Sequence, residues 1–172
     1  MPITIQRAPL PSLIQRLAEP RRFVQVVAGP RQVGKTTLVR QALAALAAQP
    51  QGHRLAQHSV SADAPGSQPA VWLSIQWEVA RALAAQAGAC VLVLDEVQKI
   101  PNWTESVKRL WDEDTAAGRD VRVVVLGLAP LLIARGLTES LAGRFEITRL
   151  GHWRYAEMRE AFDVSLDEFV FY

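Results

Sequence analysis

Eight consecutive residues combine glycines, a lysine and a threonine in an order suited to holding a polyphosphate. They match the pattern G-x-x-x-x-G-K-[ST] and read Gly29, Pro30, Arg31, Gln32, Val33, Gly34, Lys35 and Thr36, with Thr37 next. Glycines let the backbone turn tightly, so that consecutive N–H groups and the next helix N-terminus point at phosphate oxygens. Lys35 supplies a positive charge for the β- and γ-phosphates, and the Thr36 hydroxyl can ligate Mg²⁺. The pattern predicts a nucleotide-phosphate site; the alternative is an ordinary turn rich in Gly and Pro.

A second chemical signal is the acidic pair Asp95 and Glu96, which directly follows the apolar run 90–94. Ligands collect beyond the carboxyl ends of parallel strands, and a Mg²⁺-associated carboxylate belongs there, which is the position we expect for Asp95. Glu96 can polarise a water molecule for attack on the γ-phosphate. The alternative is a solvated acidic strand end.

Two neighbouring classes of nucleotide-binding protein fit poorly. Small switch-type GTPases have Asp-x-x-Gly at the acidic strand end and a later Asn-Lys-x-Asp, whereas this chain has Asp95, Glu96, Val97 and Gln98 and lacks the second motif. Small-molecule kinases usually need no Glu beside the metal aspartate and carry an Arg-rich lid. Neither class is therefore a good fit to this sequence.

The elements that must position these residues alternate along the chain. Apolar runs predict strands and helical spacing predicts helices, which together indicate an α/β fold with a largely parallel sheet. The expected strands are 23–28, 56–60, 90–94, 121–126 and 145–150, and the expected helices are 37–46, 70–87, 103–117 and 130–142. Within 70–87 we expect Trp72 and Trp77 to pack in the core rather than stack on bases.

Composition narrows the class further. The chain has 172 residues, a net charge of +2 and one cysteine, Cys90, which we expect to fill the core. No apolar run is long enough for a membrane span, and the three histidines lack metal-ligand spacing. A lone cysteine fits a reducing compartment, so we expect a cytoplasmic protein.

Four arginines lie close together near the N-terminus, at Arg7, Arg16, Arg21 and Arg22. They leave two interpretations open, a contact with DNA or an ordinary solvated face. The second is the more common origin of such a cluster.

Three segments together resemble a prokaryotic family of AAA-type P-loop ATPases whose core is typically followed by a C-terminal domain of unknown function. They are residues 29–38, residues 94–103 and the run Ser140, Leu141, Ala142, Gly143 and Arg144. The resemblance implies a three-layer α/β/α sandwich with a mainly parallel five-stranded sheet of the additional-strand class. It also implies ATP and Mg²⁺ as ligands, Lys35 and Thr36 as phosphate and metal residues, Asp95 as the metal acid and Glu96 as the water-activating base.

The same resemblance suggests a role for Arg144, just before the last expected strand. That position looks like the one from which AAA ATPases donate an arginine finger to a neighbouring subunit, so a homo-oligomer is expected if Arg144 is catalytic. The alternative is a structural arginine that closes the helix beside Gly143.

The chain departs from the family pattern after the fourth core strand. Relatives usually carry a polar side chain there that senses the γ-phosphate, whereas this chain has Leu128 and Ala129. The departure motivates an alternative function, a nucleotide-responsive interaction module with negligible turnover. We expect residues 1–21 to pack on an ATPase core at 22–151, and 152–172 to begin a C-terminal region that is cut short.

Overall fold

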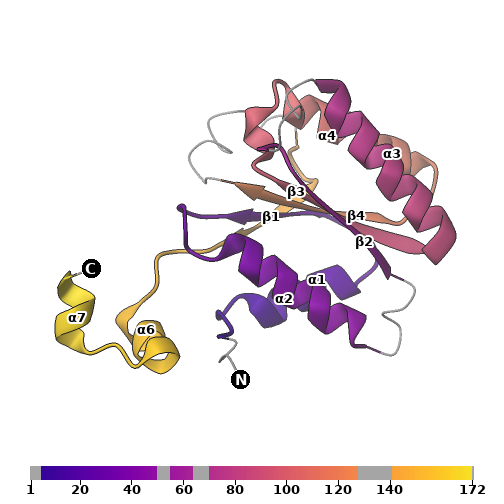
Figure 1. Cartoon of the computed structure of the whole chain (residues 1–172). Helices are drawn as coiled ribbons and strands as arrows, with labels where there is room; N and C mark the ends of the chain where they lie inside the picture. Colours follow the sequence, from indigo (N-terminus) through magenta and orange to yellow (C-terminus); the bar gives the residue numbers. More distant parts are fainter. Residues whose placement is uncertain (1–4, 50–54, 64–69, 128–140, 172) are drawn as a thin grey trace.

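The computed structural model describes residues 5–49, 55–63, 70–127 and 141–171. Its centre is a parallel sheet in the order β2-β3-β4-β1-β5 (Figure 1). The strands are β1 (Val24–Ala28), β2 (Leu55–Ser61), β3 (Ala89–Asp95), β4 (Val121–Gly127) and β5 (Phe145–Arg149). Because β4 lies between β1 and β3, the sheet has the additional strand that the resemblance implied. The expected α/β fold with a five-stranded parallel sheet is confirmed.

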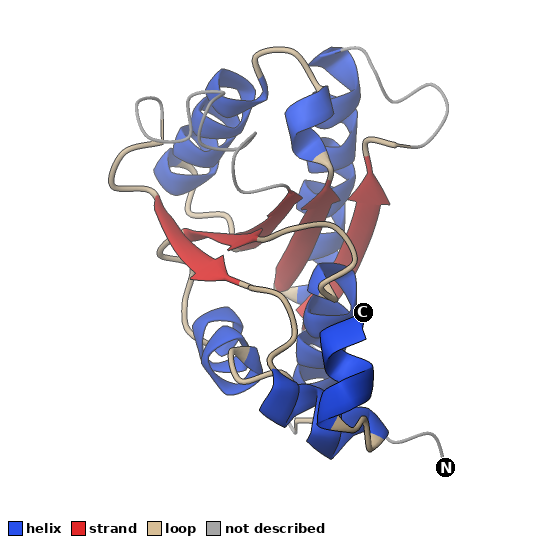
Figure 2. Ribbon diagram, turned by 90° about the vertical axis from the view of Figure 1, so that its left-hand side faces the viewer, coloured by secondary structure: helices blue, strands red, loops and turns tan. Residues whose placement is uncertain are grey.

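Helices cover both faces of the sheet and complete three layers (Figures 1 and 2). One face carries α1 (Leu10–Ala18) and α2 (Lys35–Ala47), and the other carries α3 (Ala70–Ala87) and α4 (Trp103–Ala116). A 3₁₀ turn, η2 (Val97–Lys99), follows β3. The last two helices, α6 (Tyr155–Phe162) and α7 (Leu166–Phe171), project from the body of the molecule.

The continuous apolar runs of the strands are explained by burial on both faces. In β3, Cys90, Leu92 and Leu94 pack in the core under α3 and α4, whereas Val91 and Val93 pack in the core under α1 and α2. Side chains alternate between the two faces of a strand, so a sheet covered on both sides needs apolar residues at every position. Cys90 is fully buried, as expected, and burial raises the pKa of its thiol to about 11.

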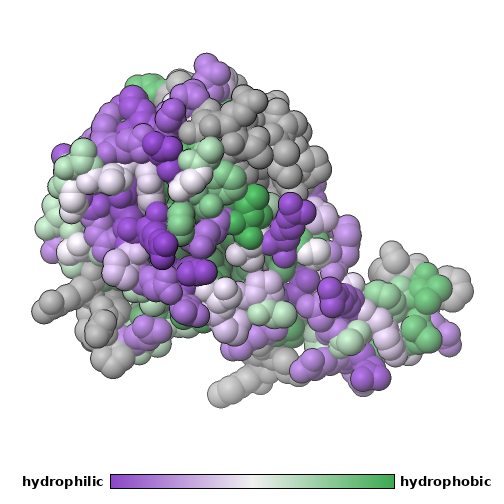
Figure 3. Space-filling model, turned by 180° about the vertical axis from the view of Figure 1, so that it is seen from behind, coloured by the Kyte–Doolittle hydropathy of each residue, from purple (hydrophilic) through white to green (hydrophobic). Residues whose placement is uncertain are grey.

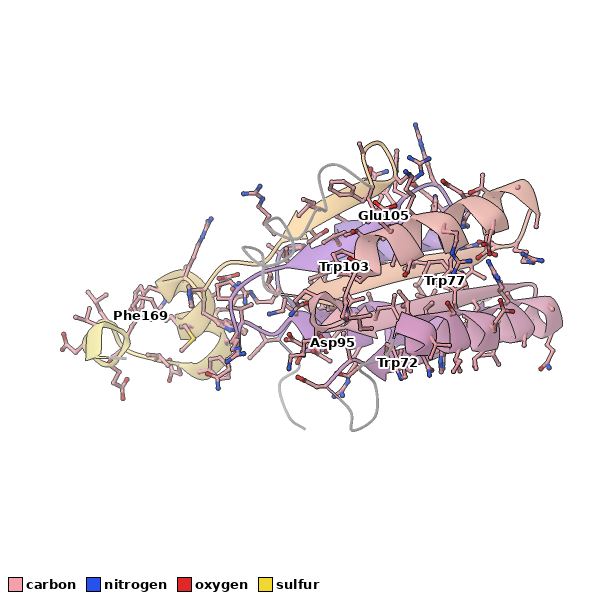
Figure 4. All side chains as sticks on the ribbon, turned by 90° about the horizontal axis from the view of Figure 1, so that it is seen from above. Trp72, Trp77, Asp95, Trp103, Glu105 and Phe169 are labelled. Atoms are coloured by element: carbon pink, nitrogen blue, oxygen red, sulfur yellow. The ribbon has the colours of Figure 1, made fainter. Side chains whose placement is uncertain are left out.

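The two tryptophans of α3 confirm the expectation of packing. Trp77 is fully buried and Trp72 is partly buried against the same core (Figure 4). The indole N–H of Trp77 donates to Oδ2 of the buried Asp114 at 2.7 Å. The Trp77 ring is therefore not free to stack on a base.

The N-terminal helix was not expected, because its region contains several prolines. The helix α1 begins after Pro9 and has Pro11 in its first turn, where the missing N–H of proline has no helical partner to lose. Its buried residues Leu10, Leu13 and Leu17 pack on the α2 side of the sheet. None of the helices in the described part of the chain has the length and hydropathy needed to cross a membrane.

Candidate functional site

The glycine-rich segment links β1 to α2 and has the backbone shape that its sequence predicts. Gly34 has φ 92° and stands immediately before α2, and Gln32 also has a positive φ of 61°. At Gly29 a Cβ would lie 2.1 Å from the carbonyl oxygen of Leu150, so this position must lack a side chain. The loop therefore curls tightly against the segment that leaves β5 and opens at the N-terminus of α2.

Lys35 lies in the first turn of α2 and folds back over the loop. Its ammonium donates to the carbonyl oxygens of Gly29 at 3.0 Å and Pro30 at 2.5 Å, and the residue is 8% exposed. Burial lowers the pKa of Lys35 from its ordinary value, and the nearby Glu96 and Asp95 carboxylates oppose that shift. These carbonyls hold a cation at the mouth of the loop, where a bound phosphate would offer it a stronger acceptor.

Thr36 and Asp95 meet across the crevice between α2 and β3. The Thr36 hydroxyl donates to Oδ2 of Asp95 at 3.1 Å. Asp95 is the last residue of β3, whose carboxyl end lies beside those of β2 and β4. Seen from above, Asp95 lies where the strands end (Figure 4). The two predicted metal ligands, 59 positions apart in the chain, are therefore brought together.

Glu96 adopts a left-handed backbone conformation, with φ 54° and ψ 30°. This conformation is uncommon for residues other than Gly, Asn and Asp. Its N–H donates to the carbonyl of Leu126 at 3.1 Å. The side-chain amide of Gln98, a residue that is 2% exposed, donates to Oε2 of Glu96. The carboxylate is thereby oriented by a buried partner, a role for Gln98 that the sequence reasoning did not identify.

These residues surround one cavity of about 480 Å³ beside the loop. Its lining consists of Arg31, Gln32, Gly34, Lys35, Thr36, Thr37, Asp63, Asp95 and Glu96. The remaining loop residues, Gly29, Pro30 and Val33, do not line it; Val33 is 1% exposed and forms part of the core that supports the loop. The cavity has room for several phosphate groups.

Asp63 is a third carboxylate of the cavity and was missed by sequence reasoning. It follows β2, and the Lys99 ammonium forms an ion pair with it. The signal that could have found it is its place just beyond a strand of the same parallel sheet, where the carboxyl ends gather. Lys99 in turn belongs to η2, so the pair joins two loops at the cavity rim.

The residues present fit a magnesium ion that is held mainly by a nucleotide. Within the described ranges no three His, Cys, Asp or Glu side chains are grouped to hold a metal on their own. Mg²⁺ in nucleotide sites is usually bound by one or two protein oxygens together with phosphate oxygens and waters. The adjacent oxygens of Thr36 and Asp95 form such a donor set.

Arg144 lies at the amino-terminal ends of the strands, whereas the cavity lies at their carboxyl-terminal ends. Its carbonyl accepts from the N–H of Val24, the first residue of β1, whereas the phosphate loop follows the last. At about 3.3 Å per residue, β1 alone separates Arg144 from the loop by roughly 13 Å or more. The guanidinium binds Asp112 through two contacts, Nε at 2.8 Å and Nη2 at 3.1 Å. Arg144 is therefore not brought to the site of its own chain.

The N-terminal arginines do not form a free cationic face. Arg21 donates to the carbonyls of Trp111 at 2.6 Å and Val121 at 3.0 Å and lies over the Trp111 ring. Arg16 pairs with acidic neighbours, and Arg7 is buried with three acceptors. Most of the cluster is thus held by the fold, which does not favour the DNA interpretation. Leu128, Ala129 and the expected helix 130–142, apart from its last two residues, lie outside the described residues.

The chain is similar to known proteins both in sequence, through a family model, and in fold. A family model described as "AAA domain" matches residues 21–159. The chain is similar in structure to the Walker-type ATPase paby2304 of Pyrococcus abyssi, with a TM-score of 0.63 and 11% identity over 92% of this chain and 57% of that chain. It is also similar to a closed-state reconstruction of Hsp104 with ATPyS and FITC casein, with a TM-score of 0.62 and 13% identity over 90% of this chain and 28% of that chain.

Both solved chains share the fold of this chain. This chain spans just over half the length of the Pyrococcus abyssi ATPase and about a quarter of the length of the Hsp104 chain. No curated protein matches the sequence. The family model covers most of the chain and includes both the phosphate loop and the acidic pair. The chain therefore belongs to the AAA domain family and has a nucleotide-binding, ATPase-like P-loop core.

Proposed function

We propose that this chain binds ATP together with Mg²⁺ at the loop 29–36 and hydrolyses it. The observation that carries the proposal is the contact between the Thr36 hydroxyl and Asp95 in a cavity that Lys35 and Glu96 also line. A metal-ligating hydroxyl, a carboxylate at the adjacent strand end, a lysine and a second carboxylate are the groups that phosphoryl transfer to water requires.

Each side chain has a task in this proposal. The loop N–H groups and the Lys35 ammonium hold the phosphates and stabilise the charge that develops on the γ-phosphoryl group. Thr36 and Asp95 would hold the Mg²⁺, which neutralises phosphate charge when bound. Glu96 accepts a proton from water while the water oxygen bonds to the γ-phosphorus. The bond from that phosphorus to the bridging oxygen breaks, and ADP and inorganic phosphate result.

The cycle of binding and hydrolysis would drive a conformational change or the binding of a partner. The alternative is a module that binds ATP or ADP and changes its affinity for a partner without appreciable turnover. The ATPase and the module without turnover would use the same nucleotide site. The rate of phosphate release distinguishes these two functions.

Calorimetric titration of the full chain with ATP, with and without Mg²⁺, tests the binding step. We expect binding that Mg²⁺ strengthens, and a loss of at least about a hundredfold in affinity for Lys35→Ala, because a buried cation that faces the phosphates is removed. Lys108→Ala, which removes a lysine of α4 outside the cavity lining, is the matched control and should bind as the unaltered chain does. Equal ATP affinity of Lys35→Ala and Lys108→Ala would overturn the assignment of the nucleotide site to this loop.

Phosphate release under saturating ATP and Mg²⁺ tests the hydrolysis step. Glu96→Gln keeps the shape of the side chain but removes the proton acceptor, so we expect release to fall by about a hundredfold or more while ATP still binds. Release that is absent already in the unaltered chain, with binding intact, would support the module without turnover.

A further inference from the structure

Arg7 is the most extensively buried arginine of the described chain, with 7% of the residue exposed. Its guanidinium makes three hydrogen bonds to three separate segments. Nη1 donates to the carbonyl of Val33 at 2.9 Å, Nη2 to the carbonyl of Gly151 at 3.1 Å, and Nε to Oε1 of Glu157 at 3.1 Å. A buried cation is costly unless it is paired, so these acceptors must be held in place together.

The first acceptor belongs to the phosphate loop itself. The peptide bond between Val33 and Gly34 is trans, so the N–H of Gly34 points opposite to the carbonyl that Arg7 binds. Gly34 lines the cavity, whereas Arg7 is absent from its lining. Arg7 therefore holds the rear of the peptide whose N–H faces the phosphate side of the loop.

The second acceptor lies where the chain leaves β5. Gly29 contacts Leu150 so closely that a Cβ could not be added, and the N–H of Leu150 donates to the carbonyl of Ala28 at 2.8 Å. Arg7 then binds the carbonyl of Gly151, the next residue. Both ends of the phosphate loop thus contact residues 150–151, one directly and one through Arg7.

The third acceptor is Glu157, which lies in the first turn of the projecting helix α6. Oε2 of Glu157 accepts from the N–H of Arg154 at 2.9 Å and fixes the start of α6, while Oε1 accepts from Arg7. The guanidinium also lies 4.3 Å from the centre of the Trp153 ring. Beyond this anchor, α6 and α7 carry the exposed apolar residues Phe162, Leu166 and Val170. Hydrophobic residues, drawn in green, lie on the projecting part of the surface (Figure 3).

We propose that Arg7 is a positioning residue of the nucleotide site and that its pair with Glu157 couples occupation of the phosphate loop to the order of α6. The inference rests on the proposed nucleotide binding. A phosphate that binds the Gly34 N–H favours the peptide orientation in which the Val33 carbonyl meets Arg7. The same orientation keeps Arg7 aligned with Glu157. By linkage, fixing α6 must then strengthen nucleotide binding to the same extent.

The test compares four forms of the full chain: unaltered, Arg7→Lys, Glu157→Gln and Glu160→Gln. The last removes an exposed charge from the same helix and is the control. ATP·Mg²⁺ affinity is measured by calorimetry, and hydrogen exchange of residues 155–162 is measured with and without ATP·Mg²⁺. We expect Arg7→Lys to bind ATP about tenfold more weakly, because a lysine cannot reach three acceptors with a planar fork.

In the unaltered chain and in Glu160→Gln, ATP should slow the exchange of α6, and in Glu157→Gln this slowing should vanish. A merely structural role for the pair would raise the exchange of α6 in Glu157→Gln equally with and without ATP, and that result would overturn the proposal. So would ATP affinity for Arg7→Lys within twofold of the unaltered chain. If Arg7→Lys does not fold, Glu157→Gln decides alone. Failure of the unaltered chain to bind ATP overturns the proposed function as well as this inference.

Discussion

At the carboxyl-terminal edge of the sheet, charged side chains surround a cavity of about 480 Å³, whereas at the amino-terminal edge a cluster of charged side chains leaves a space of only about 10 Å³. The first space is lined by Lys35, Asp95 and Glu96, and the second by residues that include Arg21 and Arg122. A volume of about 10 Å³ holds no more than a single water. Charged side chains line both of these spaces, and in the described part of the chain the first has room for a ligand whereas the second does not.

The partners of the charges differ in the same way. Arg122 donates to the carbonyl of Leu17 at 2.6 Å and to both oxygens of Asp120, so its donors are used within the fold. At the other edge, Lys35 binds loop carbonyls at the border of an open cavity, where a phosphate can compete for it. We infer that a cluster of arginines in a sequence forms a binding surface only where the fold leaves the guanidinium donors accessible.

The largest effect is expected at the amino-terminal edge, from Asp114→Ala. Asp114 is fully buried and accepts from Trp77, from Nε of Arg81 at 2.7 Å and from Arg119 at 3.3 Å. Its removal leaves the buried indole N–H of Trp77 without this acceptor and breaks the hydrogen bonds from Arg81 and Arg119, although Arg81 keeps Glu78 and Glu113. Because an unpaired buried donor and two charge-assisted hydrogen bonds are involved, we expect the free energy of unfolding to fall by about 3 kcal/mol or more. Denaturant titration measures the loss. The free energy of unfolding of Asp114→Asn should lie between those of the unaltered chain and Asp114→Ala.

The folded fraction of Asp114→Ala should still bind ATP with unaltered affinity. A loss of affinity in folded protein would break the division of the molecule into a structural edge and a ligand edge.

A smaller effect on stability, but a larger one on binding, is expected for Gly29→Ala at the opposite edge. The added Cβ would overlap the Leu150 carbonyl oxygen, so the loop must shift, at a cost of about 1–3 kcal/mol in stability. ATP affinity should fall at least about tenfold, as calorimetry can measure. Gly151→Ala adds a Cβ in open space close by and should change neither quantity.

A pH effect is expected where the loop meets the projecting helices. The N–H of Arg154, and then the charge and hydrogen bond of Arg7, lower the pKa of Glu157. A depressed carboxyl pKa stabilises the folded state above the unfolded pKa of about 4.3, and this contribution is lost as the pH falls through the folded pKa. Melting curves between pH 7 and pH 3 should show a smaller acid-induced decrease for Glu157→Gln. Parallel curves for both proteins would contradict the assignment.

The smallest effect on the isolated chain is expected for Arg144→Ala. Arg144 pairs with Asp112 of α4, and the two side chains are 34% and 45% exposed. Surface pairs of this kind stabilise proteins little, so Arg144→Ala and Asp112→Ala should alter melting equally and slightly.

Phosphate release over a range of protein concentrations then separates the two roles of Arg144. If it acts as a finger between copies of the chain, Arg144→Ala lowers turnover at high protein concentration and Asp112→Ala does not. Equal turnover in both variants would leave Arg144 a structural arginine only.

Much of the fold could be predicted because the local signals were strong. The helix expected at 70–87 has those bounds in the structure, and each expected strand is present within one or two residues of its expected ends. The helix α1 was missed because the prolines near it suggest a break, and only its packing on α2 shows that Pro11 lies in a first turn that tolerates it.

The candidate site was predictable where one short motif specifies both the shape and the chemistry. Gly34, Lys35 and Thr36 follow from the loop pattern, and Asp95 from its place after an apolar strand. Asp63 carries no such motif, because it becomes part of the cavity only through the pairing of β2 with β3. Gln98 was also missed, since its contact with Glu96 depends on the 3₁₀ turn after β3.

The sequence by itself determined the phosphate loop, the acidic pair and the alternation of strands and helices, because each is encoded within a few neighbouring residues. Only the tertiary structure decided which charges face the cavity and which are held by the fold. Arg7 illustrates the reason: its three acceptors lie 26, 144 and 150 positions away in the chain. Contacts over such separations depend on how the whole sheet is assembled, and no local pattern contains them.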